Sequence, residues 1–394
     1  MTVAAIVLAG GGARGAYEAG VLRYLRDEVP GGATFAPRIL CGTSVGAIHA
    51  SFLAATADRP AEQGRALAAI WEDLELGDVF RLGLADLVQA WRRMGGGEAA
   101  PGGLVDAAPL EELVRNRIPW ERLRANIDGG VVGALSVSAT EVSTGKTVVF
   151  VDRTGGGVPP WSRDAHVVAR ARAIGPLHTL ASAAIPFVFP AVRVDGEFFC
   201  DGGLRQNTPL SPALRLGAER VLVVGARHAP RIATDAAQER AREADFPTPL
   251  FLAGKVLNAL LLDRIDYDLA RLEGFNTMLD GLEKAFGPDA IARLAETMQG
   301  SRGQAYRRVR AVYVRPSKDI GRMAGEYASS DEFRSRTKGL TGRLARRLAN
   351  REASREADFL SYFLFDGGFA RQLMALGFED ARARHADLAG LVAG

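Results

Sequence analysis

The sequence contains little cysteine and no long apolar segment. Only two of its 394 residues are cysteines, Cys41 and Cys200, which excludes a fold held together by several disulfides. The longest apolar stretch, residues 181–192, is interrupted by two prolines and is too short to cross a membrane. No basic segment precedes the apolar residues 3–9, so we expect no signal peptide. These absences predict a globular protein of the reducing cytoplasm.

The sequence also has no large excess of positive or negative charge, and it contains no recognisable metal-binding motif. The 49 basic and 46 acidic side chains leave a formal net charge of only +3, and we expect no nucleic-acid partner. The sequence has no H-E-x-x-H motif and no cluster of cysteine and histidine, so we expect neither a metal nor a cofactor. Glycine, in contrast, is plentiful, with 45 residues that gather in short clusters.

Strand-like and helix-like segments alternate through the first half of the chain. Apolar residues 3–9 and 38–41 are each followed by a glycine-rich turn and then by a helical pattern, at 16–27 and 47–57. This order predicts an α/β fold in which helices cover both faces of a mostly parallel central sheet. Further strands are expected at 131–139, 147–151, 192–194, 198–200 and 221–225.

The pattern changes after about residue 230, where long helical periodicity dominates. We take 221–225 as the last clear strand. The sequence therefore suggests an α/β domain at 1–229 and a mainly helical C-terminal region at 230–394 whose role it does not indicate.

A G-x-S-x-G motif lies between the second strand and the following helix. The serine of such a motif occupies a tight, strained turn, and small flanking residues allow neighbouring backbones to approach. The helix that follows directs its positive end toward the serine, which favours negative charge there. The alternative is a glycine-rich turn without chemistry. The motif consists of Gly42, Thr43, Ser44, Val45 and Gly46.

A second glycine cluster follows the first strand and fits G-x-G-x-x-G, the pattern of a dinucleotide-binding turn. That function requires an acidic residue at the end of the second strand, where this sequence has the serine motif instead. Consecutive glycine amides at a helix start can also form an oxyanion hole, and the arginine can add charge or position the loop. A packing turn is the alternative. The cluster comprises Gly10, Gly11, Gly12, Ala13, Arg14 and Gly15.

The third motif is Asp201-Gly202-Gly203, at the end of a predicted hairpin. Taken together and in this order, the three motifs resemble the patatin-like phospholipases, over about residues 5–225. The resemblance implies a three-layer patatin-like α/β fold, with Ser44 as nucleophile, Asp201 as general base and the Gly10–Gly15 loop as oxyanion hole. It also implies that the substrates are acyl esters of lipids or phospholipids.

A histidine base is the alternative to a Ser44–Asp201 dyad. His228 is the strongest rival, because it follows a predicted strand and comes after Ser44 and Asp201 in the order of some serine hydrolases. A dyad requires direct contact between Asp201 and Ser44. It also predicts that activity persists near pH 6.5, where a histidine base would titrate.

Two further stretches suit a lipid substrate. An apolar mouth of the active site can be formed by Ile185, Phe187, Val188 and Phe189. The alternative is that these residues belong to the buried core. Residues 334–351 carry seven basic and no acidic residues with leucines at four-residue spacing, which predicts either peripheral contact with an anionic membrane or a helix packed on the domain.

An acyltransferase would share the same acyl-enzyme, so sequence alone does not separate it from a hydrolase. A non-catalytic lipid-binding module is also compatible with these motifs, because the presence of catalytic residues does not prove their geometry. The Gly10–Gly15 loop, taken by itself, would also allow a nucleotide-dependent oxidoreductase.

Overall fold

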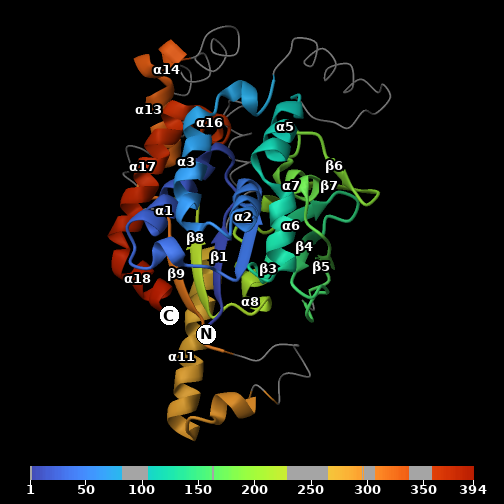
Figure 1. Ribbon diagram of the computed structural model, residues 1–394, viewed down its shortest axis with the longest axis vertical. Coiled ribbons are helices and arrows are strands. Elements are labelled where there is room, and N and C mark those ends of the chain that lie inside the picture. Colours follow the sequence, from blue (N-terminus) through green and yellow to red (C-terminus); the bar gives the residue numbers. More distant parts are fainter. Residues whose placement is uncertain are drawn as a thin grey trace, which may run out of the picture.

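A nine-stranded mixed sheet forms the centre of the protein in a computed structural model (Figure 1). Seven strands follow the order β5-β4-β3-β2-β1-β8-β9, and the β6–β7 hairpin joins the sheet through β3. The structure describes residues 2–81, 105–161, 164–228, 265–294, 296, 307–336 and 357–394.

The elements of the sheet and of the layers around it have the following bounds. The strands are β1 (Ala4–Leu8), β2 (Ile39–Thr43), β3 (Ala134–Glu141), β4 (Thr147–Arg153), β5 (Val167–Ala171), β6 (Val192–Val194), β7 (Glu197–Asp201), β8 (Arg220–Val224) and β9 (Arg310–Val314). The described α-helices are α1 (Gly15–Asp27), α2 (Val45–Ala55), α3 (Gln63–Asp73), α5 (Ala108–Arg117), α6 (Trp120–Asp128), α7 (Pro176–Ala183), α8 (Leu210–Arg215), α11 (Ile265–Phe286), α13 (Ile320–Ala328), α14 (Asp331–Arg336), α16 (Ala357–Phe363), α17 (Gly367–Ala383) and α18 (His385–Ala393).

The middle of the sheet, from β3 through β2, β1 and β8 to β9, is parallel, whereas β4 and β7 run antiparallel to β3. Side chains of β1 alternate between two buried clusters. Ile6 and Leu8 pack on one face with α1, α2, α3 and α17, and Ala5 and Val7 pack on the other with α8 and α11. The predicted α/β fold with a mostly parallel sheet between helical layers is thus confirmed, as is a mainly helical C-terminal region.

The C-terminal part of the chain joins this core directly. Residues 221–225 are not the last strand, because β9 extends the sheet beside β8. Helix α17 crosses α1 so closely that a Cβ added at Gly20 would lie 2.0 Å from the Met374 carbonyl oxygen, and one at Gly377 would lie 2.1 Å from that of Tyr17. Glycine is needed at both crossing points because any larger residue would separate the two helices.

The β6–β7 hairpin, the two cysteines and the helices agree with the sequence in their local features. The hairpin of β6 and β7 turns at Asp195 and Gly196, both with positive φ, as that dipeptide predicts. Cys41 and Cys200 are free thiols rather than a disulfide. Among the described residues, none of the helices combines the length and the apolar character needed to span a membrane.

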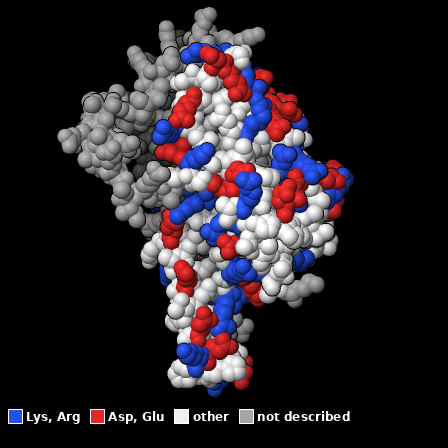
Figure 2. Space-filling model, turned by 90° about the vertical axis from the view of Figure 1, so that its left-hand side faces the viewer, with Lys and Arg blue, Asp and Glu red and all other residues white. Residues whose placement is uncertain are grey.

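The predicted basic helix at 334–351 falls almost entirely outside the described residues. Its first two arginines end α14, where Arg334 pairs with Asp331 and Arg336 pairs with Asp366. On the face shown in Figure 2, acidic and basic side chains intermingle and neither forms a continuous patch.

Candidate active site

Ser44 lies in a strained turn between β2 and α2. Its φ of 56° and ψ of −127° are unusual for a residue with a side chain and place the hydroxyl at the start of the helix. The flanking glycines make the turn possible: a Cβ at Gly42 would lie 2.1 Å from the Gly46 carbonyl oxygen, and one at Gly46 would lie 2.4 Å from that of Leu8. The G-x-S-x-G segment therefore forms a strained strand-to-helix turn, the conformation that a nucleophile elbow requires.

Asp201 contacts Ser44 directly. The Ser44 hydroxyl donates to Asp201 Oδ2 at 2.6 Å, within the range that proton transfer requires. Gly203, in the short turn η5 (Gly202–Leu204), donates its amide to Asp201 Oδ1 at 2.7 Å. Ser44 is 4% exposed and Asp201 is fully buried. Residues 157 positions apart in the sequence thus form one hydrogen-bonded pair in the protein interior.

Burial changes the acid–base behaviour of this pair. It raises the pKa of Asp201 from 3.8 to about 6, although the hydrogen bonds from Ser44 and Gly203 lower it. A carboxylate is a poor base for a hydroxyl at its ordinary pKa, and desolvation brings its proton affinity closer to what general-base catalysis near neutral pH needs.

The glycine loop runs beside Ser44. A Cβ added at Gly10 would lie 3.1 Å from Ser44 Cβ. Asn207 positions the loop, because its carbonyl accepts from the Gly10 amide at 3.1 Å and its side-chain amide donates to the Gly10 carbonyl at 3.2 Å. Within the described part of the chain, the amides of Gly11 and Gly12 donate to no protein group. These two amides, rather than that of Gly10, are the candidate donors to an oxyanion.

Arg14 is turned into the protein rather than toward solvent. Its Nε donates to Ser361 Oγ at 2.8 Å, and its guanidinium stacks 4.0 Å above the Tyr362 ring. With 5% exposure, Arg14 joins the short turn η1 (Gly12–Arg14) to α16. Residues of the C-terminal region thereby support the glycine loop.

Comparison with known proteins identifies the family. The family model of the patatin-like phospholipases matches residues 6–214, more than half of the chain. The chain belongs to the patatin-like phospholipase family. Membership in this family implies lipid acyl hydrolysis as the class of activity.

Two solved structures are similar at low sequence identity. VipD from Legionella pneumophila is 14% identical with a TM-score of 0.35, and the match covers 95% of this chain and 67% of VipD. Human GIVD cytosolic phospholipase A2, solved with methyl gamma-linolenyl fluorophosphonate, is 12% identical with a TM-score of 0.41, and the match covers all of this chain and 58% of the human one. No curated protein matches the sequence.

In this patatin-like protein His228, the rival base, has another partner, and so has His49, which lies on the helix that follows Ser44. His228 Nδ1 lies 2.9 Å from the Pro316 carbonyl oxygen. His49 Nδ1 lies 2.7 Å from Glu18 Oε2, and its Nε2 accepts from Trp71 Nε1 at 3.0 Å. Because an indole N–H only donates, His49 Nε2 must be unprotonated. Among the described residues, no histidine is hydrogen-bonded to the Ser44–Asp201 pair.

Two residues beside this pair were not recognised from sequence as part of the site. Ser182 Oγ accepts from the Ser44 amide at 2.8 Å and donates to the Ser138 carbonyl at 2.6 Å. Thr140 Oγ1 donates to the Asp201 carbonyl at 2.9 Å. Small hydroxyl residues in apolar stretches carry no pattern that distinguishes such roles, so only the fold identifies them.

The stretch expected to form an apolar mouth divides between core and surface. Ile185 and Phe189 are buried, whereas Phe187 is 78% exposed with a positive φ of 69°. Phe189 belongs to a buried aromatic cluster in which Phe80 lies edge-on to it at 6.3 Å. The cluster also includes Phe363, Phe365 and Trp71, the last two stacked on each other.

Proposed function

We propose that the protein hydrolyses carboxylic esters of lipids through an acyl-enzyme on Ser44. The observation that carries this proposal is the 2.6 Å hydrogen bond between Ser44 Oγ and Asp201 Oδ2 inside a strained elbow. In the first step Asp201 accepts the hydroxyl proton while Ser44 Oγ attacks the ester carbonyl carbon. The carbonyl oxygen becomes an oxyanion, which the amides of Gly11 and Gly12 and the positive end of α2 stabilise.

The proton held by Asp201 then passes to the departing alcohol, which leaves Ser44 acylated. Water attacks the acyl carbon in the second half-reaction, gives up a proton to Asp201 and releases the fatty acid, and the proton returns to Ser44. A buried carboxylate suits both halves because its raised pKa lets it accept and return a proton.

The test compares wild type with Ser44→Ala, Asp201→Asn and His228→Ala on p-nitrophenyl butyrate and on a fluorogenic phospholipid. We expect both dyad variants to lose at least about a thousandfold in kcat/KM, and His228→Ala to match wild type. Loss of activity in a folded His228→Ala variant would replace the dyad by a triad. A wild type without turnover on either substrate would favour a non-catalytic lipid-binding module.

A further inference from the structure

Three buried side chains that the proposed reaction does not use are joined by hydrogen bonds beside the active site. Glu18 Oε2 lies 2.7 Å from His49 Nδ1, and Trp71 Nε1 donates to His49 Nε2 at 3.0 Å. All three are buried, and His49 is only 2% exposed. Since Nε2 accepts from the indole, the proton of the neutral imidazole is on Nδ1, which donates it to Glu18. We call these three residues the buried chain.

Each member of the buried chain comes from a different helix. Glu18 lies in the first turn of α1, which begins at Gly15, the last residue of the glycine loop. His49 lies in the second turn of α2, which begins directly after Ser44. Trp71 belongs to α3, which packs against α1. The buried chain therefore ties the helix that follows the glycine loop to the helix that follows the nucleophile.

Close packing joins the buried chain to the glycine loop itself. A Cβ added at Gly15 would lie 2.5 Å from Val45 Cγ2 and 3.0 Å from Trp71 Cζ2. Burial raises the pKa of Glu18, whereas its hydrogen bond with the imidazole and the nearby backbone of Ala9 lower it. Trp71 thus packs against the last residue of the glycine loop, and the Glu18 carboxylate lies beside the residue that precedes the loop.

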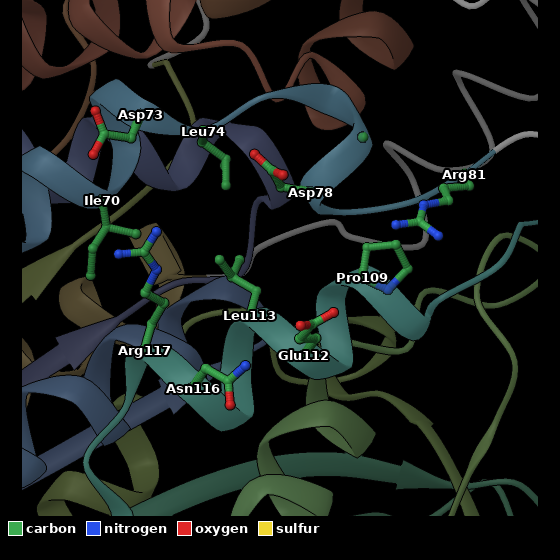
Figure 3. A pocket seen from close by; sticks show the side chains of 11 residues that line it. Ile70, Asp73, Leu74, Asp78, Arg81, Pro109, Glu112, Leu113, Asn116 and Arg117 are labelled. Atoms are coloured by element: carbon green, nitrogen blue, oxygen red, sulfur yellow. The ribbon is translucent and has the colours of Figure 1, made fainter.

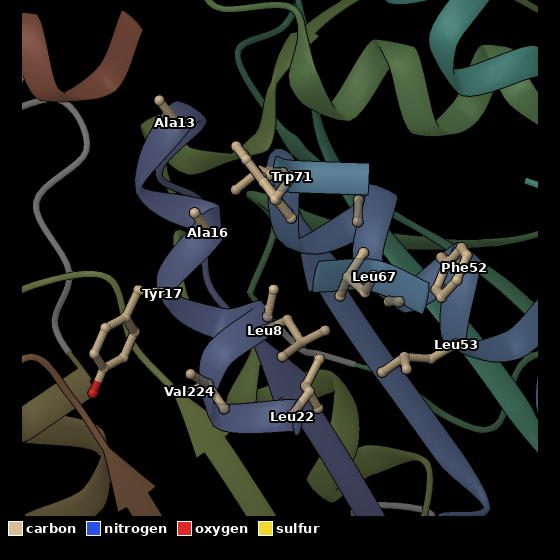
Figure 4. Packing of buried hydrophobic residues seen from close by; sticks show 14 of the residues in the cluster. Leu8, Ala13, Ala16, Tyr17, Leu22, Phe52, Leu53, Leu67, Trp71 and Val224 are labelled. Atoms are coloured by element: carbon tan, nitrogen blue, oxygen red, sulfur yellow. The ribbon is translucent and has the colours of Figure 1, made fainter. Parts of the chain in front are cut away.

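The buried chain does not line the groove of about 300 Å³ that separates α3 from α5 (Figure 3). Ile70 and Asp73 face this groove from α3, whereas Trp71 lies in the apolar cluster that α3 shares with α1 (Figure 4). Hydrogen bonds in such low-dielectric surroundings are strengthened, which suits them to hold a fixed geometry.

We propose that the buried chain positions the glycine loop against the nucleophile elbow during catalysis. Oxyanion donors are effective only within about 2.7–3.1 Å of the developing charge, so a displaced loop loses transition-state stabilisation while the fold persists. The candidate donors, Gly11 and Gly12, lie between Ala9 and Gly15, the two places where the buried chain meets this segment. The inference rests on the proposed hydrolysis and gives the three members the role of positioning residues.

The test compares Trp71→Phe with the matched control Trp120→Phe. Trp120 of α6 donates its indole N–H to the Val114 carbonyl at 3.1 Å, so both changes delete the same atoms and one hydrogen bond. On p-nitrophenyl butyrate we expect Trp71→Phe to lower kcat about tenfold at an unchanged KM, and Trp120→Phe to match wild type. Melting temperatures show whether each variant is folded.

Inhibition by an alkyl trifluoromethyl ketone reports the geometry of the oxyanion hole. Ser44 Oγ adds reversibly to the ketone carbon, the hydroxyl proton passes to Asp201, and the ketone oxygen becomes an oxyanion that resembles the transition state. The Ki should therefore rise about tenfold in Trp71→Phe, in parallel with the loss of kcat, and stay unchanged in Trp120→Phe. A loss of stability alone would lower the melting temperature and leave the Ki of the folded enzyme unchanged.

Two variants of Glu18 separate its hydrogen bond from its charge. Glu18→Gln keeps an oxygen that accepts from His49 Nδ1, so kcat should stay within about threefold of wild type, whereas Glu18→Ala should lose about tenfold. The tautomer is measured independently of turnover by NMR of protein labelled in its histidine side chains. The signal of His49, assigned by its absence in His49→Asn, should show the proton on Nδ1.

Four results would each overturn the inference. They are a wild-type kcat and Ki in Trp71→Phe, an equal loss in Trp120→Phe, an equal loss in both variants of Glu18, and a proton of neutral His49 on Nε2. A wild type that turns over no ester would overturn the proposed hydrolysis and this inference with it. The kinetic comparisons are made against an active wild type, so their failure remains distinct from failure of the proposed hydrolysis.

Discussion

Replacing Asp201 by Asn should abolish hydrolysis and also make the protein more stable above neutral pH. The amide has nearly the same shape as the carboxylate and can keep both hydrogen bonds. Its oxygen would accept from the Gly203 amide and its NH₂ group would donate to Ser44 Oγ. The change that remains is the loss of a negative charge from a fully buried site.

The size of the effect follows from the pKa of Asp201. Burial raises it from 3.8 to about 6. A tenfold difference in proton affinity corresponds to about 1.4 kcal/mol, so ionising Asp201 costs the folded state about 3 kcal/mol. The pKa is higher in the folded than in the unfolded state. The cost is therefore absent below about pH 4, grows as the pH rises, and is complete above about pH 6.

Urea unfolding of wild type and Asp201→Asn at about pH 8 and about pH 4 measures this difference. The variant should gain as much as about 3 kcal/mol at the higher pH and nothing at the lower. Ser44→Ala is the control, because it keeps the carboxylate and removes a donor, and it should be less stable than wild type at about pH 8. A gain for Asp201→Asn of equal size at both pH values, or a loss at the higher one, would refute the reasoning.

Three other perturbations follow from the same geometry. Since Asp201 must be ionised to act as a base, kcat/KM of wild type should rise with pH through a midpoint near 6 and then level off; a midpoint near 4 would contradict the effect of burial. Gly46→Ala should prevent folding, judged by circular dichroism, because the new Cβ would collide with β1, whereas Gly175→Ala, with nothing within 4 Å, should fold normally. Ser182→Ala should lower stability in chemical denaturation by about 1–3 kcal/mol, because it leaves the buried Ser44 amide without an acceptor, and an unchanged unfolding midpoint would show that water replaces the hydroxyl.

The pH prediction modifies what the sequence suggested. A carboxylate base with its ordinary pKa implied activity that persists near pH 6.5, the pH at which a histidine base would lose its activity by protonation. With full burial of Asp201 the two bases titrate close together, so the pH profile separates them poorly. Substitution of Asp201 and of His228 is therefore the sharper test of which residue is the base. The extent of burial was not readable from Asp201-Gly202-Gly203, because desolvation depends on what the rest of the chain places over that turn.

Features that depend on local backbone chemistry were predictable. The Gly42–Gly46 elbow and the Asp195-Gly196 turn adopt the expected conformations, because steric limits on φ and ψ act within a few residues. The direct contact of Ser44 with Asp201 was predictable in a different way, from the order of three motifs that resemble a family. Neither local sterics nor motif order predicts the hydrogen bonds of Ser182 to Ser44 and Ser138. These bonds form only because α7 packs beside β3 in the folded chain.

Strand β9 and the partners of Arg14 illustrate the same limit at longer range. Arg310–Val314 is short and lies among basic residues, so its apolar positions give a weak periodic signal, and β8 supplies the pairing that makes it a strand.

Arg14 was expected to add charge or to position the glycine loop, and its geometry favours the second role. Its guanidinium is bonded to Ser361 and stacked on Tyr362 rather than free to face an oxyanion. The loop beside Ser44 is therefore supported from one side by Asn207 and from the other by the C-terminal region, so the conformation of the candidate oxyanion hole depends on residues far beyond the three motifs that first identify it.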